Sequence, residues 1–293
     1  MASNVKPFRP KGPVYGAASG PVQSRPKRPI VFLALPTMTG SVNLGIHGWL
    51  FESLMRSLVG DLPWEFALQH VNQIVPVEYA RNVLSGMFLK RTDCSKMFFI
   101  DHDMIPDADA YQLLADDTAD IVVGRCLIFD AKTADSPPRM KFSAFMHDPK
   151  DELFRSIVPS PNERESEIDG AGAACMVVKR AVIEDRRMWL ETKYKNLAGD
   201  DCDLDLERAD PMWAPPIFRR TCAPNGRTMR GEDLDFCSRA KALGYKVKII
   251  WTAGFGHLKE VNLENVMELC HNAVEAYKQS IELPQIAKGA KEA

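Results

Sequence analysis

The sequence lacks the cysteine patterns of zinc ribbons and of disulfide-stapled domains. Its 293 residues include seven cysteines, an odd number, and none of them forms a Cys-x-x-Cys pair. A structural zinc site would need such pairs, and a complete disulfide framework would need an even number of cysteines. We therefore exclude both and expect a reducing compartment.

A long hydrophobic run is also missing. The strongest early apolar stretch, residues 30–35, is far shorter than the roughly 20 residues that cross a bilayer. The N-terminal residues contain no apolar core typical of a secretory signal peptide. We expect a soluble, cytoplasmic protein with no membrane partner.

Neither basic nor acidic residues are in large excess. Lys and Arg total 37 against 39 Asp and Glu, which gives a formal net charge of −2. This balance excludes a uniformly basic nucleic-acid coat and an acidic disordered chain. The charge is unevenly distributed, however, because residues 1–30 carry six basic residues and no acidic ones, which leaves −8 on the remainder. Any polyanion binding would begin in this basic segment.

Residues 1–29 are also poor in the apolar side chains that a packed domain needs. Six prolines and three glycines accompany the basic residues there. Such a composition cannot bury enough apolar surface to offset the entropy lost on ordering the chain. We expect a disordered or surface-bound arm, followed by an ordered domain that begins at residue 30.

Beyond the arm, short apolar runs alternate with segments whose apolar residues have helical spacing. The expected strands are near residues 30–35, 65–70, 96–100, 121–124, 142–145, 176–178 and 246–251. The expected helices are near residues 45–60, 79–90, 107–114, 231–245 and 263–281. Strands separated by helices of this length favour a parallel sheet with right-handed crossovers. The predicted fold class is α/β, a mixed and mostly parallel sheet flanked by helices in a single domain.

The pattern Asp-x-Asp has little value alone, because it occurs five times, at 101/103, 107/109, 201/203, 203/205 and 233/235. Only the first pair directly follows a hydrophobic strand, and open α/β sheets bind ligands at the carboxyl ends of their strands. In an extended segment, Asp101 and Asp103 would project to the same side and could share Mg²⁺ or Mn²⁺. Such a cation can neutralise a departing nucleotide diphosphate. The alternative is a pair of solvated turn acids.

A second acidic cluster opens the helix expected at 231–245. Glu232 and Asp233 would lie in its first turn, where the helix dipole stabilises negative charge. A carboxylate there can act as general base for an acceptor hydroxyl, or can orient the acceptor. The alternative is that both acids only cap the helix. After the last strand, His257 could add a nitrogen ligand to the same cation and Lys259 could contact a phosphate, although a single histidine is more often structural.

Five motifs follow the first apolar strand in order: Ala80-Arg81-Asn82, Met97-Phe-Phe-Ile-Asp-His-Asp-Met104, Asp169-Gly-Ala-Gly-Ala173, Gly231-Glu-Asp-Leu-Asp-Phe-Cys237 and Gly256-His-Leu-Lys259. Together they resemble a GT-A glycosyltransferase of the family-2-like kind found in bacteriophage and bacterial genomes, over residues 30–260. The resemblance implies a nucleotide-sugar donor, with a UDP-sugar favoured, in a donor half at 30–125. It further implies Mn²⁺ or Mg²⁺ as cofactor and a hydroxyl acceptor held by residues 126–260, followed by a C-terminal helix and tail at 261–293.

The resemblance also assigns roles to the acidic residues. Asp101 and Asp103 match the metal and diphosphate motif of the family, and His257 matches its late metal ligand. Glu232 and Asp233 match its acidic pair on the acceptor side. Asp233 is the expected base if the enzyme inverts the anomeric configuration.

Other positions match the family through their size or polarity. Pro36 and Thr37 match the turn against which the donor nucleotide packs. Arg81 matches a polar donor contact, for which a guanidinium and a phosphate are well suited; the alternative is a surface helix residue. Gly170 and Gly172 match a small-residue loop that a sugar approaches closely, or they are plain turn glycines.

The segment 198–230 departs from a short acceptor loop. Trp213 and Phe218 are interleaved there with several arginines and acids. Aromatic and Arg side chains can stack on a sugar ring or a nucleobase and can hold phosphate. Beside the basic arm, this suggests a DNA acceptor, with a bacteriophage enzyme in the host cytoplasm that glycosylates a hydroxymethylated base flipped out of the duplex. The negative charge beyond the arm would oppose duplex binding.

Two other functions stay open. One is a catalytically silent GT-A-like module that binds a glycan or a nucleic acid without turnover. The other is a nucleotidyltransferase, which shares the sheet and the acidic metal site but normally has a Gly-rich phosphate loop near the first strand. Residues 37–41 contain a single glycine, which argues against the latter.

Overall fold

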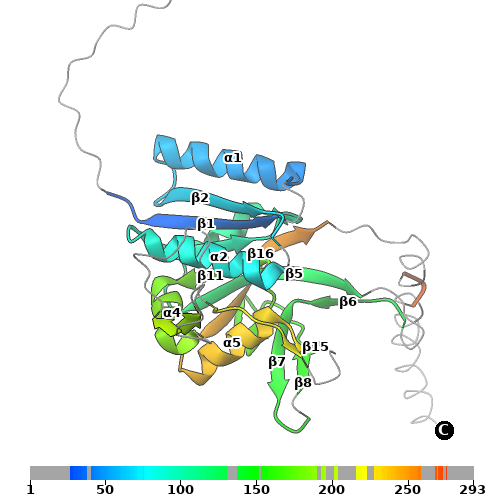
Figure 1. The fold of residues 1–293 in the computed structure, drawn as a ribbon. Helices are drawn as coiled ribbons and strands as arrows, with labels where there is room; N and C mark the ends of the chain where they lie inside the picture. The colour runs from blue at the N-terminus through cyan, green and yellow to red at the C-terminus, as the bar shows by residue number, and fades with distance from the viewer. Residues whose placement is uncertain are drawn as a thin grey trace, which may run out of the picture.

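The structure, a computed structural model, is organised around one large mixed sheet (Figure 1). It describes residues 27–37, 41–74, 76–130, 137–151, 153–189, 193–195, 201–203, 216–222 and 228–258, together with 268, 270–272 and 275. The expected arm before residue 27, most of the segment 198–230 and most of the expected C-terminal helix lie outside these residues. No helix in the described ranges combines the length and the apolarity needed to cross a bilayer.

The central sheet has nine strands, and its strand directions confirm the mixed, mostly parallel α/β class. In spatial order, its main path contains β2 (Glu65–Asn72), β1 (Ile30–Thr37), β3 (Cys94–Ile100), β11 (Cys175–Lys179), β5 (Ile121–Asp130), β16 (Val247–His257) and β4 (Met104–Pro106). Strands β2, β1, β3, β5 and β16 run in one direction. Strand β11 runs the opposite way between β3 and β5.

The remaining strands lie at the borders of this sheet. Strands β6 (Arg139–Phe142) and β9 (Glu165–Glu167) pair antiparallel with β5 and β16. The other pairings are β10 (Gly170–Ala171) with β7 (Ala144–Asp148) and β8 (Leu153–Ser156), β12 (Lys193–Lys195) with β13 (Asp201–Asp203), and β14 (Thr221–Cys222) with β15 (Thr228–Arg230). The expected single strand at 142–145 is wrong, because Ser143 separates β6 from β7 and these two strands belong to different sheets.

Helices cover both faces of the central sheet. One core contains side chains from α1 (Leu44–Val59), η1 (Ala108–Tyr111) and α3 (Gln112–Ala115). The other contains side chains from α2 (Val77–Lys90), α4 (Arg180–Glu184), η2 (Arg186–Met188) and α5 (Glu232–Ala242). Because strand side chains alternate between faces, Val31 and Leu33 of β1 enter the first core and Phe32 enters the second.

Local capping explains where the longest helices begin and end. The Asn43 side chain accepts a hydrogen bond from the backbone N–H of Ile46, which caps α1. Gly60 ends α1 with a φ of 92°, a left-handed conformation that glycine adopts without strain. Gly244 follows α5 with a φ of 91°, as expected from its position. The Asp107 side chain caps η1 by accepting from the backbone N–H of Asp109.

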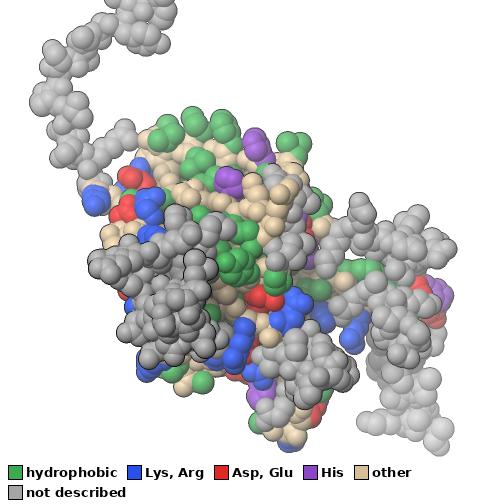
Figure 2. All heavy atoms as spheres, in the orientation of Figure 1, with side chains coloured by type: hydrophobic (Ala, Val, Ile, Leu, Met, Phe, Trp, Pro, Cys, Tyr) green, Lys and Arg blue, Asp and Glu red, His purple; other side chains and the backbone are tan. Residues whose placement is uncertain are grey.

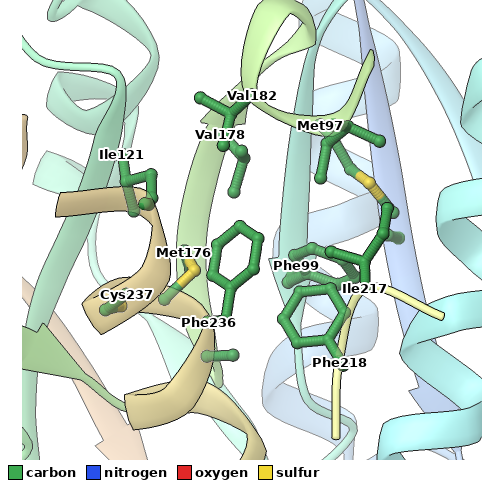
Figure 3. Close-up of a cluster of buried hydrophobic side chains, with 14 of the residues drawn as sticks. Met97, Phe99, Ile121, Met176, Val178, Val182, Ile217, Phe218, Phe236 and Cys237 are labelled. Atoms are coloured by element: carbon green, nitrogen blue, oxygen red, sulfur yellow. The ribbon is translucent and has the colours of Figure 1, made fainter. Parts of the chain in front are cut away.

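An aromatic stack ties α5 to the middle of the sheet (Figure 3). The rings of Phe218 and Phe236 are stacked with centroids 4.5 Å apart, and Phe99 of β3 meets Phe218 edge-on at 5.5 Å. All three side chains are buried. Asn82 of α2 fixes this segment, because its side chain accepts from the backbone N–H groups of Ile217 and Phe218 and donates to the Phe218 carbonyl. The position of α5 therefore depends on this stack.

We expect Phe236→Ala to lower the free energy of unfolding by about 3–5 kcal/mol, because it removes a fully buried ring and leaves a cavity beside Phe218. Urea denaturation followed by circular dichroism would measure the change. Phe51→Ala is the matched control, since Phe51 lies on α1 with 63% of its side chain exposed. Equal effects of the two substitutions would contradict the packing described here.

Candidate active site

A cavity of about 330 Å³ opens at the carboxyl ends of β1, β3 and β5. This is the edge of an open α/β sheet at which ligands bind. The cavity brings together nine of the twelve residues that the sequence singled out: Pro36, Thr37, Arg81, Asp101, Asp103, Gly172, Glu232, Asp233 and His257. Of the other three, Gly170 does not line it, and Trp213 and Lys259 lie outside the described residues.

A buried arginine is at the centre of the site. Arg81 of α2 is 3% exposed, so the alternative of a surface helix residue is wrong. Its Nη2 lies 3.1 Å from both carboxylate oxygens of Asp101, and its Nη1 donates to Oε1 of Glu232. Burial alone would lower the pKa of Arg81, but the charges of Asp101, Glu232 and Asp233 outweigh it and raise that pKa. The guanidinium therefore stays charged and connects β3 to α5.

Asp101 and Asp103 lie in a tight turn. The backbone N–H of Met104 donates to the carbonyl of Asp101 at 3.0 Å, which closes a four-residue turn. The expected extended conformation is therefore wrong, although both carboxylates line the same cavity. Asp101 points to Arg81, whereas Asp103 points to His257, and the two carboxylates enter the cavity from different ends of the turn.

Asp103, in the turn after β3, pairs with His257, the last residue of β16. Oδ2 of Asp103 and Nε2 of His257 are 3.0 Å apart, and the backbone N–H of Leu258 donates to the Asp103 carbonyl. Burial would raise the pKa of Asp103, but the hydrogen bond with His257 and the electrostatic effects of His257 and His102 outweigh it and lower that pKa. The other ring nitrogen of His257, Nδ1, is buried and has no hydrogen-bond partner among the residues that the structure describes.

The first turn of α5 supplies the other two carboxylates. Glu232 is buried against Arg81, so it does more than cap the helix. The Oδ1 atom of Asp233 accepts from the backbone N–H of Leu234 at 2.8 Å. Burial and the neighbouring charge of Glu232 raise the pKa of Asp233 to about 6, against the opposing effect of Arg81. Asp233 is therefore a carboxylate that takes up a proton just below neutral pH.

Gly172 lies opposite Asp233 in the cavity wall. A Cβ atom at Gly172 would lie 2.4 Å from Oγ of Ser143 and 3.6 Å from Oδ2 of Asp233. The Ser143 hydroxyl accepts from the backbone N–H of Gly172 at 3.0 Å, which fixes this close approach. Only glycine leaves the space beside Asp233 open.

Sequence reasoning missed several residues that shape the site. Asn82 holds residues 217–218, as described above, and Ser143 and Cys126 line the cavity. Asn43 donates from its side chain to the carbonyls of His102 and Met104 and so fixes the turn that carries the acidic pair. In the sequence, Asn82 was named only as the neighbour of Arg81 in the motif Ala80-Arg81-Asn82. The other positions carry no local pattern, because their partners are far away in the sequence.

The donor chemistry suits a hard divalent cation, since Asp101, Asp103 and His257 are among the carboxylates and imidazoles that border the same cavity. These side chains are nevertheless not gathered around one point. Among the described residues, no group of three His, Cys, Asp or Glu side chains is placed to hold a metal ion. Both oxygens of Asp101 face Arg81, and Asp103 faces His257. A bound cation would share Asp101 with Arg81, because a carboxylate oxygen that accepts a hydrogen bond keeps a further lone pair.

The fold and the cavity together define a mixed α/β protein with an acidic site at the carboxyl ends of its strands. No protein-family model and no curated protein sequence matches the chain. Among solved structures, A197 from STIV aligns with 80% of this chain and 87% of its own, at a TM-score of 0.41 and 19% identity.

Two further solved structures are similar at a comparable level. GalNAc-T7 with UDP, GalNAc and Mn²⁺ aligns with 80% of this chain and 44% of its own, at a TM-score of 0.42 and 9% identity. The inositol-1-phosphate CTP transferase from T. maritima aligns with 78% of this chain and 91% of its own, at a TM-score of 0.36 and 11% identity. The order and directions of the strands establish the mixed α/β fold class, and the glycosyltransferase resemblance stays a prediction.

We expect Arg81→Met to lower the free energy of unfolding by about 3–5 kcal/mol, because it leaves Glu232 and Asp101 without their buried counter-charge. Urea denaturation at pH 7 would measure the loss. Arg155→Met is the control, since the Arg155 side chain is 58% exposed and its ion pairs lie at the surface. A loss below about 1 kcal/mol for Arg81→Met would show that the network does not stabilise the fold.

We expect Asp233→Asn to stabilise the protein at pH 8, by up to about 3 kcal/mol, because it removes a charge that burial disfavours. A raised pKa means that the wild-type side chain favours folding when protonated and loses this contribution as the pH rises through about 6. The stability difference should therefore shrink as the pH falls from 8 to 4, as melting temperatures would show. Asp61→Asn, at an exposed position, should give no such trend.

Proposed function

We propose that the chain is a metal-dependent glycosyltransferase, which transfers a sugar from a nucleotide-diphosphate sugar to a hydroxyl group. The observation that carries the proposal is the charge of the cavity. Asp101, Asp103, Glu232 and Asp233 line it, and among the described lining residues Arg81 is the one Lys or Arg. Like charges repel strongly where water is partly excluded. An anionic nucleotide would therefore enter this cavity as a complex with a divalent cation.

The donor would bind over the carboxyl ends of β1 and β3. Asp101, Asp103 and His257 would hold the cation, which when bound neutralises the diphosphate as it departs. Pro36 and Thr37 would form the wall against which the nucleotide packs. The Thr37 hydroxyl donates to the carbonyl of Val71 at 3.1 Å, which ties this wall to β2.

Asp233 is the candidate general base. Its raised pKa of about 6 leaves it deprotonated at neutral pH and basic enough to accept a proton. The acceptor hydroxyl would give its proton to the Asp233 carboxylate while its oxygen bonds to the anomeric carbon. The bond from that carbon to the diphosphate oxygen would break at the same time. Glu232, held by Arg81, would keep the first turn of α5 in place.

The donor and acceptor are narrower proposals. We favour a UDP-sugar as donor, and a hydroxymethylated base of bacteriophage DNA as a possible acceptor class. The DNA acceptor is supported by the basic residues before position 30 and by the arginines between 219 and 230. A catalytically silent binding module is the second candidate, since Arg81 already occupies both oxygens of Asp101. Mn²⁺-dependent hydrolysis of a nucleotide sugar would exclude it.

We expect UDP with Mn²⁺ to raise the melting temperature of the protein, and Asp103→Ala to abolish this shift. Asp109→Ala is the matched control, because Asp109 also belongs to an Asp-x-Asp pair but is exposed and does not line the cavity, so it should leave the shift intact. Asp233→Asn should keep the shift and lower sugar transfer or hydrolysis by about 10²–10⁴-fold. A screen of nucleotide sugars would then identify the donor. A wild-type protein that shows no shift with any nucleotide and metal would refute the proposal.

A further inference from the structure

We infer that a second cavity, next to the candidate active site, binds a singly charged oxyanion on the acceptor; its assignment to the acceptor rests on the proposed function. This hairpin cavity has a volume of about 180 Å³ and is lined by residues of the β7–β8 hairpin and α5, together with Asp169 and Arg230. Figure 1 shows the hairpin and α5 as neighbouring elements. The lining residues of the cavity are His147, Phe154, Asp169, Arg230, Ser238 and Lys241. Of these, Arg230 belongs to the segment 198–230, whose arginines were considered from the sequence as phosphate contacts; the others were not assigned as site residues.

The hairpin cavity carries an unbalanced positive charge. Lys241 pairs with Asp169, whose other oxygen accepts from the backbone N–H of His147 at 2.8 Å. Those two charges cancel. Arg230 forms no ion pair with any described residue, and its guanidinium lies 5.1 Å from the centroid of the Phe154 ring. One positive charge is therefore available, which suits a ligand with one negative charge.

Packing orients the arginine before a ligand arrives. The Phe154 ring contacts Arg230 and also His147, whose ring centroid is 5.1 Å away. Stacking on an aromatic ring restricts a guanidinium to few orientations and leaves its N–H groups free at the edge. A planar fork of donors is suited to two oxygens of a carboxylate or a phosphodiester. Ser238 adds a hydroxyl to the same wall.

The two cavities are close neighbours. A Cβ atom at Gly170 would lie 3.3 Å from the Phe154 ring, on the side of the hairpin cavity, whereas Gly172 borders Asp233. Two residues of chain span at most about 7 Å. On the α5 side, Arg230 comes two residues before Glu232. One small acceptor could therefore place an oxyanion at Arg230 and a hydroxyl at Asp233.

The surface agrees with two adjoining regions of opposite charge. In Figure 2, Lys and Arg side chains lie directly beside acidic ones near the middle of the face shown. An acidic cavity next to a basic one gives an acceptor a preferred direction, because its anionic group is repelled from the first and attracted by the second. The positive charge in the hairpin cavity would therefore favour an anionic acceptor over a neutral sugar.

The test titrates the full-length protein with dimethyl phosphate and, separately, with acetate at constant ionic strength, followed by ligand-observed NMR. We expect at least one of the two probes to bind. The probe with the higher affinity identifies whether the oxyanion of the acceptor is a phosphodiester or a carboxylate. Arg230→Gln should weaken this binding about tenfold or more. Arg155→Gln, an exposed arginine on the same hairpin, should leave it unchanged. Arg230→Lys, which keeps the charge but loses the fork, should give an intermediate affinity.

The outcomes separate this inference from the proposed function. The melting shift with UDP and Mn²⁺ should be the same in Arg230→Gln and in the wild type. Binding of neither probe, or equal losses in Arg230→Gln and Arg155→Gln, would overturn the hairpin cavity as an oxyanion site. Oxyanion binding without any nucleotide shift would keep the oxyanion site but refute its acceptor role, together with the glycosyltransferase.

Discussion

The arrangement of the site depends on the ion pairs of one buried guanidinium. Arg81 is almost inaccessible to water, so its charge is stable only with carboxylates in direct contact. Asp101 and Glu232 supply them from β3 and from α5, which are separated by more than a hundred residues in the sequence. If either carboxylate moved away, the buried Arg81 guanidinium would lose a counter-charge in a region of low dielectric constant. The strand edge and the first turn of α5 are therefore held in one geometry.

This geometry leaves the cavity with more negative than positive charge. Arg81 offsets part of the charge of Asp101 and Glu232, whereas burial raises the pKa of Asp233 and Asp103 pairs with His257. Evolution could have filled the cavity with apolar side chains at less cost to stability. Under the proposed function, a bound divalent cation would reduce the repulsion among these carboxylates.

Local patterns were sufficient for much of the fold. The strands at 30–35 and 96–100 were predictable because a buried parallel strand is continuously apolar, and the ends of α1 and α5 because a glycine follows each. The position of Asp101 at a strand end followed from the same reasoning. These features involve residues that are near one another in the sequence.

The remainder depends on contacts between distant segments. The insertion of β11 between β3 and β5, antiparallel to both, has no local signature, and the break at Ser143 is decided by sheets that form elsewhere. The pairing of Arg81 with Glu232 could not be foreseen, since either residue alone is compatible with a surface position. The tight turn at Asp101 is set by Asn43 from another element.

The second half of the chain is irregular for a related reason. Under the proposed function this half would hold the acceptor, and its short strands and turns place backbone and side chains at angles that a helix cannot reach. Gly170 and Gly172 let the backbone approach Phe154 and Asp233 closely, and Arg230 ends a two-stranded ribbon just before α5 begins. Acidic and basic groups thus come to lie within a few residues of each other. A molecule that carries both a hydroxyl and an anionic group would be bound in one orientation only, since the reverse orientation would place its negative charge among the carboxylates.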